Sequence, residues 1–540
     1  MGFARTCSVA LVGVEGVVVE VQADLEPGVA TFTLVGLPDK SLSESRDRVR
    51  AAVVNSGAEW PQKKLTVGLS PAAVPKSGSG FDLAVACAVL GAAERIDPRT
   101  LTDLMMIGEL GLDGRVRPVR GVLPAVLAAA EAGYRQVVVA EETVPEASLV
   151  PDVSVLGVRS LGRLIALLND EPMPEEDPGG LSDGTASGRD GRGSGTYVPG
   201  AGWSGGIGGP AAHPVDMADV AGQGSARRAL EVAAAGRHHI FLKGPPGAGK
   251  TMLAERLPGL LPPLTSQQSL EVTAVHSVAG ALPAGQPLLT HSPYCAPHHS
   301  ATMASLIGGG SGLPRPGAVS LAHHGVLFVD EAAECSGRVL DAMRQPLESG
   351  HVVIARTSGV MRMPARFLLV LAANPCPCGR YGMKSGGCEC RPSAIRRYRA
   401  RLSGPLMDRV DLRVPVNPLS RSELAGLHGT SESTAVIAQR VLAARERAAE
   451  RYAETPWAAN SDVPGHELRT RWPAEPGALA KAEAEMERGL LTARGLDRVL
   501  RVAWTVADLA GHDRPTAADV DCALELRTGV RHGAAQHSRA

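Results

Sequence analysis

The sequence predicts an α/β protein of two or three domains, and three observations support this. Short apolar runs alternate with helical stretches from about residue 215 to 416, a segment rich in Gly, Ser and Pro covers about 170 to 213, and "GPPGAGKT" is a complete phosphate-loop sequence. Alternating strands and helices are typical of a parallel sheet with helices on its faces. We expect a first domain over 1–168, a flexible linker over 169–213, a core over 214–418, a helical lid over 419–530 and a frayed tail over 531–540.

The charge balance and the hydropathy pattern of the sequence limit the classes of protein to which it can belong. The 540 residues contain 55 Lys and Arg against 56 Asp and Glu, so any contact with DNA must come from local basic clusters. No run approaches the roughly 20 apolar residues of a membrane span. The opening "MGFARTCSVALVGVEGVVVEV" carries Glu15 and Glu20 where a signal peptide needs apolar residues, so it predicts a strand region of a cytoplasmic protein.

The first 168 residues predict a compact α/β domain. "TFTLVGL", "KKLTVGLS" and "RQVVVA" read as strands, while "FDLAVACAVLGAA" and "VLPAVLAAAEAG" have helical spacing. Ser41 with Glu44 forms a capping box that opens a helix through about Ser56. Asp113 and Gly114 predict a hairpin turn.

The segment "IFLKGPPGAGKTMLAERL" predicts a strand, a phosphate-binding loop and a helix. Backbone N–H groups of such a loop, together with the helix N-terminus, bind phosphate. Lys250 is predicted to reach the β- and γ-phosphates, and the Thr251 hydroxyl to ligate Mg²⁺. Glycine is required at 244, 247 and 249 for close approach or backbone angle. The predicted ATP-binding residues are Gly244, Pro245, Pro246, Gly247, Ala248, Gly249, Lys250, Thr251 and Met252.

Two later strands end in polar residues that belong at the same edge of the sheet. "GVLFVDEAAE" ends in Asp330 and Glu331, and "RFLLVLAANP" ends at Asn374. We expect Asp330 to hold Mg²⁺, Glu331 to polarise the attacking water, and Asn374 to orient water or sense the γ-phosphate. Two acids at a strand end can also be merely solvated, but the complete phosphate loop favours the catalytic interpretation.

Four of the nine cysteines form the pattern Cys376-x-Cys378, nine residues, Cys388-x-Cys390. Four thiolates in two close pairs can surround Zn²⁺ tetrahedrally, and a reducing compartment favours this over disulfides. Redox chemistry is the alternative, disfavoured because no Cys-x-x-Cys pair is present. We predict a structural zinc site that stiffens the loop after Asn374.

The order of "GPPGAGKT", "VLFVDE", "LAANP" and "LMDRVDL" resembles AAA+ ATPases of the magnesium-chelatase-like and MCM-like branch. "APHHSATMASLIGGG" and "NPCPCG" make the sequence similar to the bacterial ComM/YifB family. From spacing alone, Arg409 fits a structural ion pair as well as a functional role, and Arg494 and Arg498 fit a solvated helix face. The resemblance implies that Arg409 is an arginine finger acting on a neighbouring subunit, and that Arg494, or else Arg498, is a sensor-2 arginine.

The first domain also resembles the catalytic domain of Lon proteases, through "PKSGSGFDLAVA" and "IGELGLDGRVRPVRGVLPAVLAA". In that comparison the nucleophilic serine falls at Gly80 and the catalytic lysine at Leu123. A Ser–Lys dyad needs both groups, so we expect no protease activity, although Ser77 and Ser79 lie near the serine position.

The ComM/YifB resemblance further implies a hexameric ring that encircles DNA and drives branch migration during recombination and natural transformation. Two basic stretches fit single-stranded or branched DNA: a predicted hairpin with Arg356, Arg362 and Arg366, and "RRYRARLSG" around Tyr398, suited to charge and stacking contacts. Both also fit ordinary solvated elements. The alternative function is a chelatase-like motor that remodels a protein partner without DNA.

His298 with His299, and His323 with His324, are two adjacent pairs that could be read as metal ligands. Neighbouring side chains diverge on a regular element, so we favour structural or pore roles over metal binding.

Overall fold

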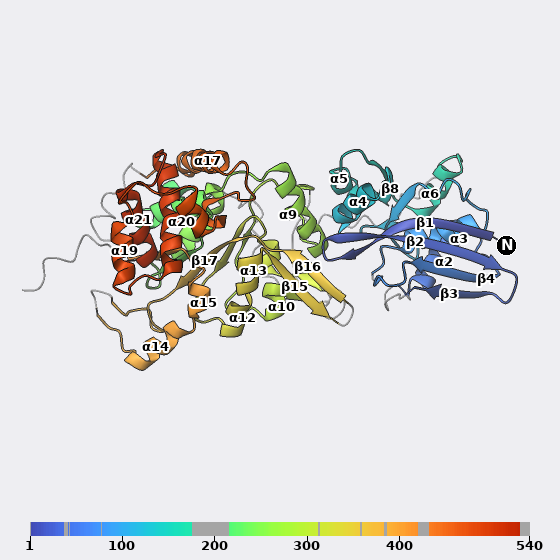
Figure 1. Ribbon diagram of the computed structural model, residues 1–540. Coiled ribbons are helices and arrows are strands. Elements are labelled where there is room, and N and C mark those ends of the chain that lie inside the picture. Colours follow the sequence, from blue (N-terminus) through green and yellow to red (C-terminus); the bar gives the residue numbers. More distant parts are fainter. Residues whose placement is uncertain are drawn as a thin grey trace, which may run out of the picture.

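The computed structural model describes residues 2–36, 42, 44–76, 78–174, 215–283, 285–310, 314–356, 359–382, 386–418 and 431–529. Most of the predicted linker, the first part of the predicted lid and the tail lie outside this range. An N-terminal α/β part, a central part with a parallel sheet and a C-terminal group of helices follow one another along the molecule (Figure 1). Among the described helices, none combines the length and hydropathy needed to cross a membrane.

The N-terminal part is built on a seven-stranded mixed sheet with strand order β3-β4-β2-β1-β5-β8-β9. The two long strands β1 and β2 are antiparallel, whereas β5, β8 and β9 follow β1 in parallel. The strands are β1 Gly2–Val12, β2 Glu15–Glu26, β3 Thr31–Val35, β4 Lys64–Ser70, β5 Leu104–Ile107, β8 Gln136–Ala140 and β9 Ser154–Val158.

The helices of this part are α2 Ser45–Asn55, α3 Asp82–Ala92, α4 Val122–Glu131, α5 Val144–Ala147 and α6 Leu161–Leu168. Helix α3 is buried along its whole length, as its uninterrupted apolar sequence requires. The predicted hairpin is confirmed as β6 Glu109–Leu110 paired with β7 Val116–Arg117. Helix α2 has Glu44 as its N-cap, without a side-chain bond, and the predicted capping residue Ser41 lies outside the described residues.

The central part contains a five-stranded sheet with order β11-β14-β17-β10-β18, and every pairing in it is parallel. The strands are β10 Ile240–Lys243, β11 Tyr294–Cys295, β14 Val326–Val329, β17 Leu368–Ala373 and β18 Leu412–Pro415. Strands β14 and β17 are buried on both faces, which explains their continuous apolar sequences. Their carboxyl ends meet at one edge of the sheet, next to the loop that follows β10.

Helices and two short hairpins surround this sheet. The helices are α7 Gly224–Gly236, α8 Lys250–Arg256, α9 Ser266–Ala279, α10 Met303–Ile307, α11 Ala318–Leu321, α12 Gly337–Ala342, α13 Arg344–Ser349, α14 Pro392–Ala400 and α15 Gly404–Met407. The hairpins pair β12 Gly308–Gly309 with β13 Arg315–Pro316, and β15 His351–Arg356 with β16 Gly359–Pro364.

The C-terminal part consists of helices, as predicted: α17 Thr434–Arg451, α18 Gly465–Thr470, α19 Ala480–Glu487, α20 Ala493–Ala510 and α21 Ala517–Thr528. Helix α20 begins at its N-cap Thr492, whose hydroxyl accepts from the Gly495 N–H, and ends at Gly511 in the left-handed conformation. Short 3₁₀ turns complete the fold at Glu141–Thr143, Met217–Asp219, Pro258–Leu260 and Asn460–Asp462.

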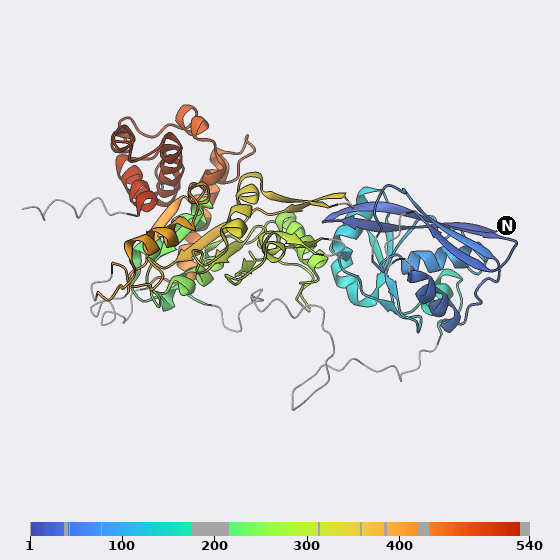
Figure 2. The same cartoon turned by 90° about the horizontal axis from the view of Figure 1, so that it is seen from below.

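Two regions of contact between the N-terminal part and the central part stand out among the described residues. Helix α4 packs beside α9, with the Gly121 N–H donating to the Ser277 carbonyl at 3.2 Å and the Ser277 hydroxyl donating to Glu146. The turn between β1 and β2 meets β16: a Cβ added at Gly13 would lie 3.0 Å from the Arg362 carbonyl oxygen and from Cγ of Met361, and Val14 packs against the apolar cluster that contains Met361. Both views place this turn beside the β15–β16 hairpin (Figures 1 and 2). The predicted flexible linker gave no indication that the N-terminal part packs against the central part.

Candidate functional site

The phosphate loop between β10 and α8 has the backbone that its glycines were predicted to allow. Gly247 and Gly249 have φ angles of 73° and 91°, a region that disfavours any side chain. Gly244 is needed for space, because a Cβ there would lie 2.1 Å from the Val416 carbonyl oxygen. Substitution at any of these three positions would therefore deform the loop.

Lys250 and Asn374 meet inside this loop although they are 124 residues apart. The Lys250 ammonium donates to the carbonyls of Gly244 at 2.8 Å and Pro245 at 2.9 Å, and to the Asn374 side-chain oxygen at 3.1 Å. Burial lowers the pKa of Lys250, while Asp330 and Glu331 act in the opposite direction. The ammonium and the amide thus face the same small region at the end of β10 and β17.

Thr251 and Asp330 lie together at the same edge. The Thr251 hydroxyl donates to Oδ2 of Asp330 at 2.8 Å, so a hydroxyl and a carboxylate oxygen are adjacent, a donor set that suits Mg²⁺. Glu331 follows with a φ of 48°, and its N–H donates to Oδ1 of Asp330 at 2.8 Å. A left-handed glutamate is strained, and strain of this kind gathers at functional sites.

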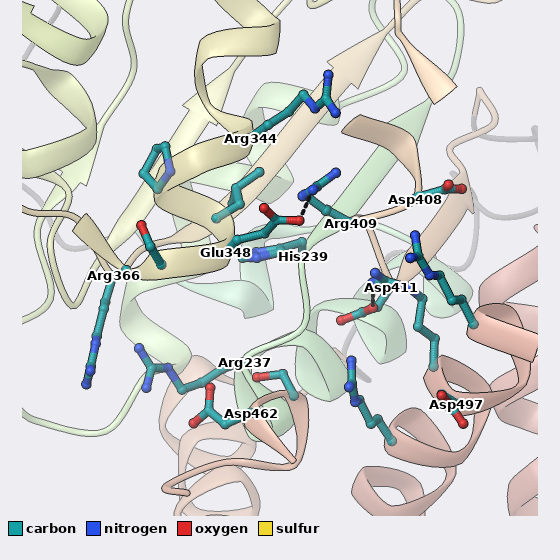
Figure 3. Close-up of a pocket in the computed structure, with 18 of the residues that line it drawn as sticks. Arg237, His239, Arg344, Glu348, Arg366, Asp408, Arg409, Asp411, Asp462 and Asp497 are labelled. Atoms are coloured by element: carbon teal, nitrogen blue, oxygen red, sulfur yellow. Dashed lines mark hydrogen bonds and ion pairs between the residues drawn. The ribbon is translucent and has the colours of Figure 1, made fainter. Parts of the chain in front are cut away.

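A second site lies between the central part and the C-terminal helices. It is a cavity of about 850 Å³ whose described lining includes eight arginines and five carboxylates. Arg409 is among them (Figure 3), as are Arg494 and Arg498. The excess of guanidinium groups suits an anion. Among the described residues that line this cavity, none belongs to the phosphate loop, so these arginines lie in a different cavity from that loop.

Arg409 reaches this cavity from the turn after α15. Its guanidinium pairs with Glu348 and donates to the Pro405 carbonyl at 2.5 Å, as Figure 3 shows for the glutamate. Burial, and then the nearby Arg344, lower the pKa of Arg409. Only 18% of the side chain is exposed.

Arg498 and Arg494 differ in their surroundings. Arg498 donates to Asp411 at 2.6 Å, and the same carboxylate accepts from His238 at 3.0 Å. Burial alone would raise the pKa of Asp411, but His238 and Arg498 more than offset it and hold the pKa below its usual range. Arg498 therefore joins the helices to the sheet, whereas Arg494 is exposed at the start of α20.

The four predicted zinc ligands form one cluster. Sγ of Cys376 lies 3.3 Å from Sγ of Cys378 and 3.8 Å from Sγ of Cys388, and Sγ of Cys378 lies 3.7 Å from Sγ of Cys388. All four sulfurs, including that of Cys390, lie within 4.8 Å of one another. Four sulfurs at about 2.3 Å from a tetrahedral zinc are about 3.8 Å apart, so the cluster fits Zn²⁺. The Arg380 N–H, followed by Cys376, lowers the pKa of Cys378 to about 6, which favours the thiolate ligand.

The cysteine loop touches the phosphate loop. Gly379 has a φ of 76°, and a Cβ there would meet Cδ of Pro246 at 2.4 Å. Arg399 of α14 donates to the Pro375 carbonyl at 3.4 Å and stacks on Tyr381, 5.0 Å from the ring centre. The prediction that Tyr398 stacks on DNA bases is wrong, because its ring is 4% exposed and packs against Ala373. The exposed aromatic side chain of this region is Tyr381.

The predicted arginine hairpin is β15–β16, but it carries only part of its predicted set. Strand β16 ends at Pro364, and Arg366 lies beyond it and lines the arginine-rich cavity (Figure 3). Arg362 is exposed on the hairpin and donates to His351 at 3.2 Å. The side chain of Arg356 lies outside the described residues.

The expectation that adjacent histidines diverge is wrong for both pairs, because the ring centres in each pair are 4.0 Å apart. His324 has a φ of 54°, which turns its ring beside that of His323, and Nε2 of both rings lies within 3.3 Å of Glu271 on α9. The hydrogen bond from His323 has the largest effect on the pKa of Glu271. Burial acts in the opposite direction, but the bonds from His323 and His324 outweigh it and lower the pKa to about 2.

The side chains of His323, His324 and Glu271 form a hydrogen-bonded structural cluster. Nδ1 of His323 accepts from the Arg366 N–H at 3.0 Å, so the ring proton lies on Nε2 and points at Glu271. A metal would need a lone pair at that nitrogen. The structural role predicted for this pair therefore agrees with its contacts.

The protease-like positions of the N-terminal part hold no Ser–Lys pair. Leu123 is fully buried, and a Cβ at Gly80 would lie 3.9 Å from Val119. The nearby Ser79 hydroxyl donates to Glu109, and the Lys76 ammonium donates to the Pro71 carbonyl. Ser77 lies outside the described residues.

Three family descriptions match the chain in succession: "Subunit ChlI of Mg-chelatase" over residues 21–143, "Magnesium chelatase, subunit ChlI" over 216–424, and "Magnesium chelatase, subunit ChlI C-terminal" over 431–527. Competence protein ComM of Haemophilus influenzae is 37% identical over 538 residues, which covers 98% of both chains. The chain belongs to the ComM/YifB family of magnesium-chelatase-like proteins.

Further members of the ComM/YifB family match over almost their whole length. A protein of Mycobacterium tuberculosis is 50% identical over 532 residues, 98% of this chain and all of that protein, and YifB of Escherichia coli is 36% identical over 523 residues, 96% of both. Lon protease of Rhizobium meliloti is 28% identical over 180 residues, which is 31% of this chain and 22% of the protease. The magnesium-chelatase-like AAA+ assignment implies ATP and Mg²⁺ as cofactors and suggests ATPase activity.

Proposed function

We propose that the protein is an ATP-hydrolysing AAA+ ring motor that acts on DNA, as a helicase or branch-migration factor in recombination and natural transformation. The observation that carries this proposal is the meeting of Lys250, Asn374, Thr251 and Asp330 at one sheet edge. ComM is a competence protein by name, and this chain matches it from end to end. The proposed boundaries are those expected from the sequence, with a Lon-like first domain that is not a protease.

The proposed hydrolysis divides the work among the residues at this edge. The loop N–H groups and Lys250 bind the phosphates, while Thr251 and Asp330 hold Mg²⁺, which would neutralise phosphate charge. Glu331 is proposed to accept a proton from the attacking water, because it directly follows Asp330 at the sheet edge and its N–H donates to the Asp330 carboxylate. Asn374 contacts Lys250 at the end of β17, where its amide is proposed to orient the attacking water or to sense the γ-phosphate.

Assembly completes the proposed site. Arg409 and Arg494 line a cavity to which the phosphate loop of the same chain contributes no described residue, so their guanidinium groups suit the nucleotide of a neighbouring subunit. Arg498 is held by Asp411, whose other oxygen accepts from His238, and this favours Arg494 as the sensor-2 arginine. We therefore propose a homo-oligomer, and a hexamer as its size, as the resemblance to the ComM/YifB family implies.

The four-cysteine loop is proposed to hold one structural Zn²⁺ between the nucleotide site and α14. Bound zinc would cross-link the loop and fix Gly379 against Pro246. The exposed Arg396 and Arg397 of α14, with Tyr381 and Arg399 beside the loop, offer charge and stacking for single-stranded DNA. The proposed zinc site therefore takes no part in catalysis and stabilises this candidate DNA-binding surface.

The zinc content of the purified protein tests the proposed four-cysteine site. We expect about one zinc per chain by elemental analysis, and Cys388→Ser to lose most of it and to lower Tm, because three ligands hold the ion poorly. Cys522→Ser, at a half-buried cysteine outside the cluster, is the matched control and should keep its metal. Wild-type protein without metal, whose four thiols all react with a thiol reagent, would contradict the proposal.

The DNA activity is tested by ATP-dependent processing of forked and four-way-junction substrates by the assembled protein. We expect unwinding or branch migration that is lost in Lys250→Ala, since the ammonium binds the phosphates. Failure on both substrates by a preparation that hydrolyses ATP would exclude the DNA motor. That outcome would favour the alternative, a chelatase-like motor that remodels a protein partner.

A further inference from the structure

The N-terminal part touches two separate elements of the central part, helix α9 and the β15–β16 hairpin. Both elements stand outside the five-stranded sheet, at the end of the central part nearest the N-terminal part (Figures 1 and 2). The protease-like positions of the N-terminal part hold no Ser–Lys pair and give it no peptide hydrolysis to perform. Its contacts with these two elements indicate a different role.

Helix α9 is shared between two apolar clusters. Ala274 of α9 is 7% exposed and belongs to the same cluster as Val126 of α4, in the N-terminal part. The next residue, Val275, is fully buried in the cluster that contains Met363 of the β15–β16 hairpin. Consecutive side chains of a helix point about 100° apart, so α9 presents one face to each part of the molecule.

Polar contacts hold the same helix against α4. The Gly121 N–H donates to the Ser277 carbonyl at 3.2 Å. One oxygen of Glu146, on α5, accepts from the Ser277 hydroxyl and also from the Leu123 N–H at 2.8 Å. Hydrogen bonds to a charged acceptor are stronger than those between neutral groups. The carboxylate of Glu146 therefore ties α9 to the first turn of α4.

Close packing inside the N-terminal part joins its two points of contact. A Cβ added at Gly121 would lie 2.3 Å from Cδ1 of Leu11 on β1, and one added at Gly16 of β2 would lie 2.4 Å from Cβ of Ala128 on α4. Helix α4 thus lies directly on the two strands whose turn carries Val14 to the hairpin. A close-packed interior transmits a displacement instead of absorbing it.

The hairpin is held from one side and exposed on the other. On the held side, a Cβ added at Gly13 would lie 3.4 Å from Sδ of the buried Met363. On the other side, Val353 pairs with Arg362 across the two strands, and Arg362 is exposed. Val353 and Val360 are 40% and 65% exposed. The contact with the N-terminal part therefore leaves the face that carries Arg362 free.

We propose that the N-terminal part is a brace that holds α9 and the β15–β16 hairpin in one fixed arrangement, so that the two elements move together. A body docked on both elements removes their relative motion before a ligand binds, so binding does not have to order them. That this prepares the free face of the hairpin for DNA rests on the proposed DNA function. The brace itself is a property of the folded chain without DNA.

The test is hydrogen exchange of the full chain without DNA or nucleotide. Val14→Asp and Ala274→Arg each place a charge in one of the two apolar contacts, where it is costly, so each variant opens its own contact. A brace needs both ends. We therefore expect exchange to be roughly tenfold faster at the opposite end as well, at α9 in Val14→Asp and at the hairpin in Ala274→Arg.

The control is Glu15→Ala, at the exposed residue beside Val14, which should exchange like the wild type. Faster exchange confined to the mutated contact, or no change in either variant, would overturn the brace. Val14 lies in a surface turn, so Val14→Asp decides the question even if Ala274→Arg does not fold.

The consequence for DNA has a separate measurement. Both variants should keep the basal ATP turnover of the wild type and lose most of the unwinding of forked DNA, because neither residue lies at the nucleotide site. Wild-type rates of unwinding in a variant whose hairpin exchanges faster would refute this consequence. A wild-type protein inactive on forked and four-way-junction DNA would refute the proposed DNA function instead, and hydrogen exchange would still decide the brace.

Discussion

Replacing Glu331 by Gln is expected to leave ATP binding intact and to lower ATP turnover by roughly two to four orders of magnitude, the contribution of general base catalysis. The amide has nearly the same shape but cannot take a proton from water. The phosphates are bound by the loop and by Lys250, which this substitution does not touch. Turnover measured by phosphate release, beside the dissociation constant of a fluorescent ATP analogue, checks both halves of the prediction.

Glu334 offers a matched control for this variant. It lies three residues farther along the chain and pairs with Arg401 at 3.0 Å, away from the proposed Mg²⁺ ligands. Glu334→Gln should keep turnover within about twofold of the wild type, because an exposed pair contributes little. Near-normal turnover in Glu331→Gln would transfer the role of base to another group.

The nucleotide loop and its strands were predictable because local sequence encodes them. A buried parallel strand needs a continuous apolar run, as in "VLFV" and "LLVLAA", and its carboxyl end must be polar where it leaves the sheet. The sequence alone was therefore enough to predict that Asp330 and Asn374 lie at the same edge of the sheet. The glycine requirements at 244, 247 and 249 follow from the same local logic.

Side-chain direction and distant contacts were not predictable in this way. Basic neighbours suggested that Tyr398 was exposed, but a helix has a buried side, and the ring lies on it with Ile395. The left-handed backbone at His324 reversed the expected divergence of a histidine pair. Arg366 is not part of the hairpin, because β16 ends two residues before it. Nδ1 of His299 lies 3.0 Å from Oε2 of Glu331 because β11 pairs with β14, and a single sequence does not state that strand order.

Removing the guanidinium of Arg409 is expected to have the other large effect. Arg409→Ala should bind ATP normally, yet its turnover should fall by about 10³ or more, the range of an arginine finger. The control is Arg498→Ala, which breaks the buried contact with Asp411 and should lower Tm instead. Phosphate release together with thermal unfolding separates a catalytic loss from a structural one.

Mixing two inactive variants decides whether Arg409 acts on a neighbour. In a mixed ring, an Arg409→Ala subunit supplies an intact phosphate loop and a Lys250→Ala subunit supplies an intact Arg409, so some interfaces contain both groups. We therefore expect the mixture to regain part of the wild-type turnover, with an optimum at intermediate ratios. If Arg409 served its own nucleotide, every subunit in the mixture would lack one essential group and no ratio would restore activity. The absence of recovery, with mixed rings shown to form, would place the finger elsewhere, and the cavity around Arg409 and Arg494 would then be a joint between sheet and helices.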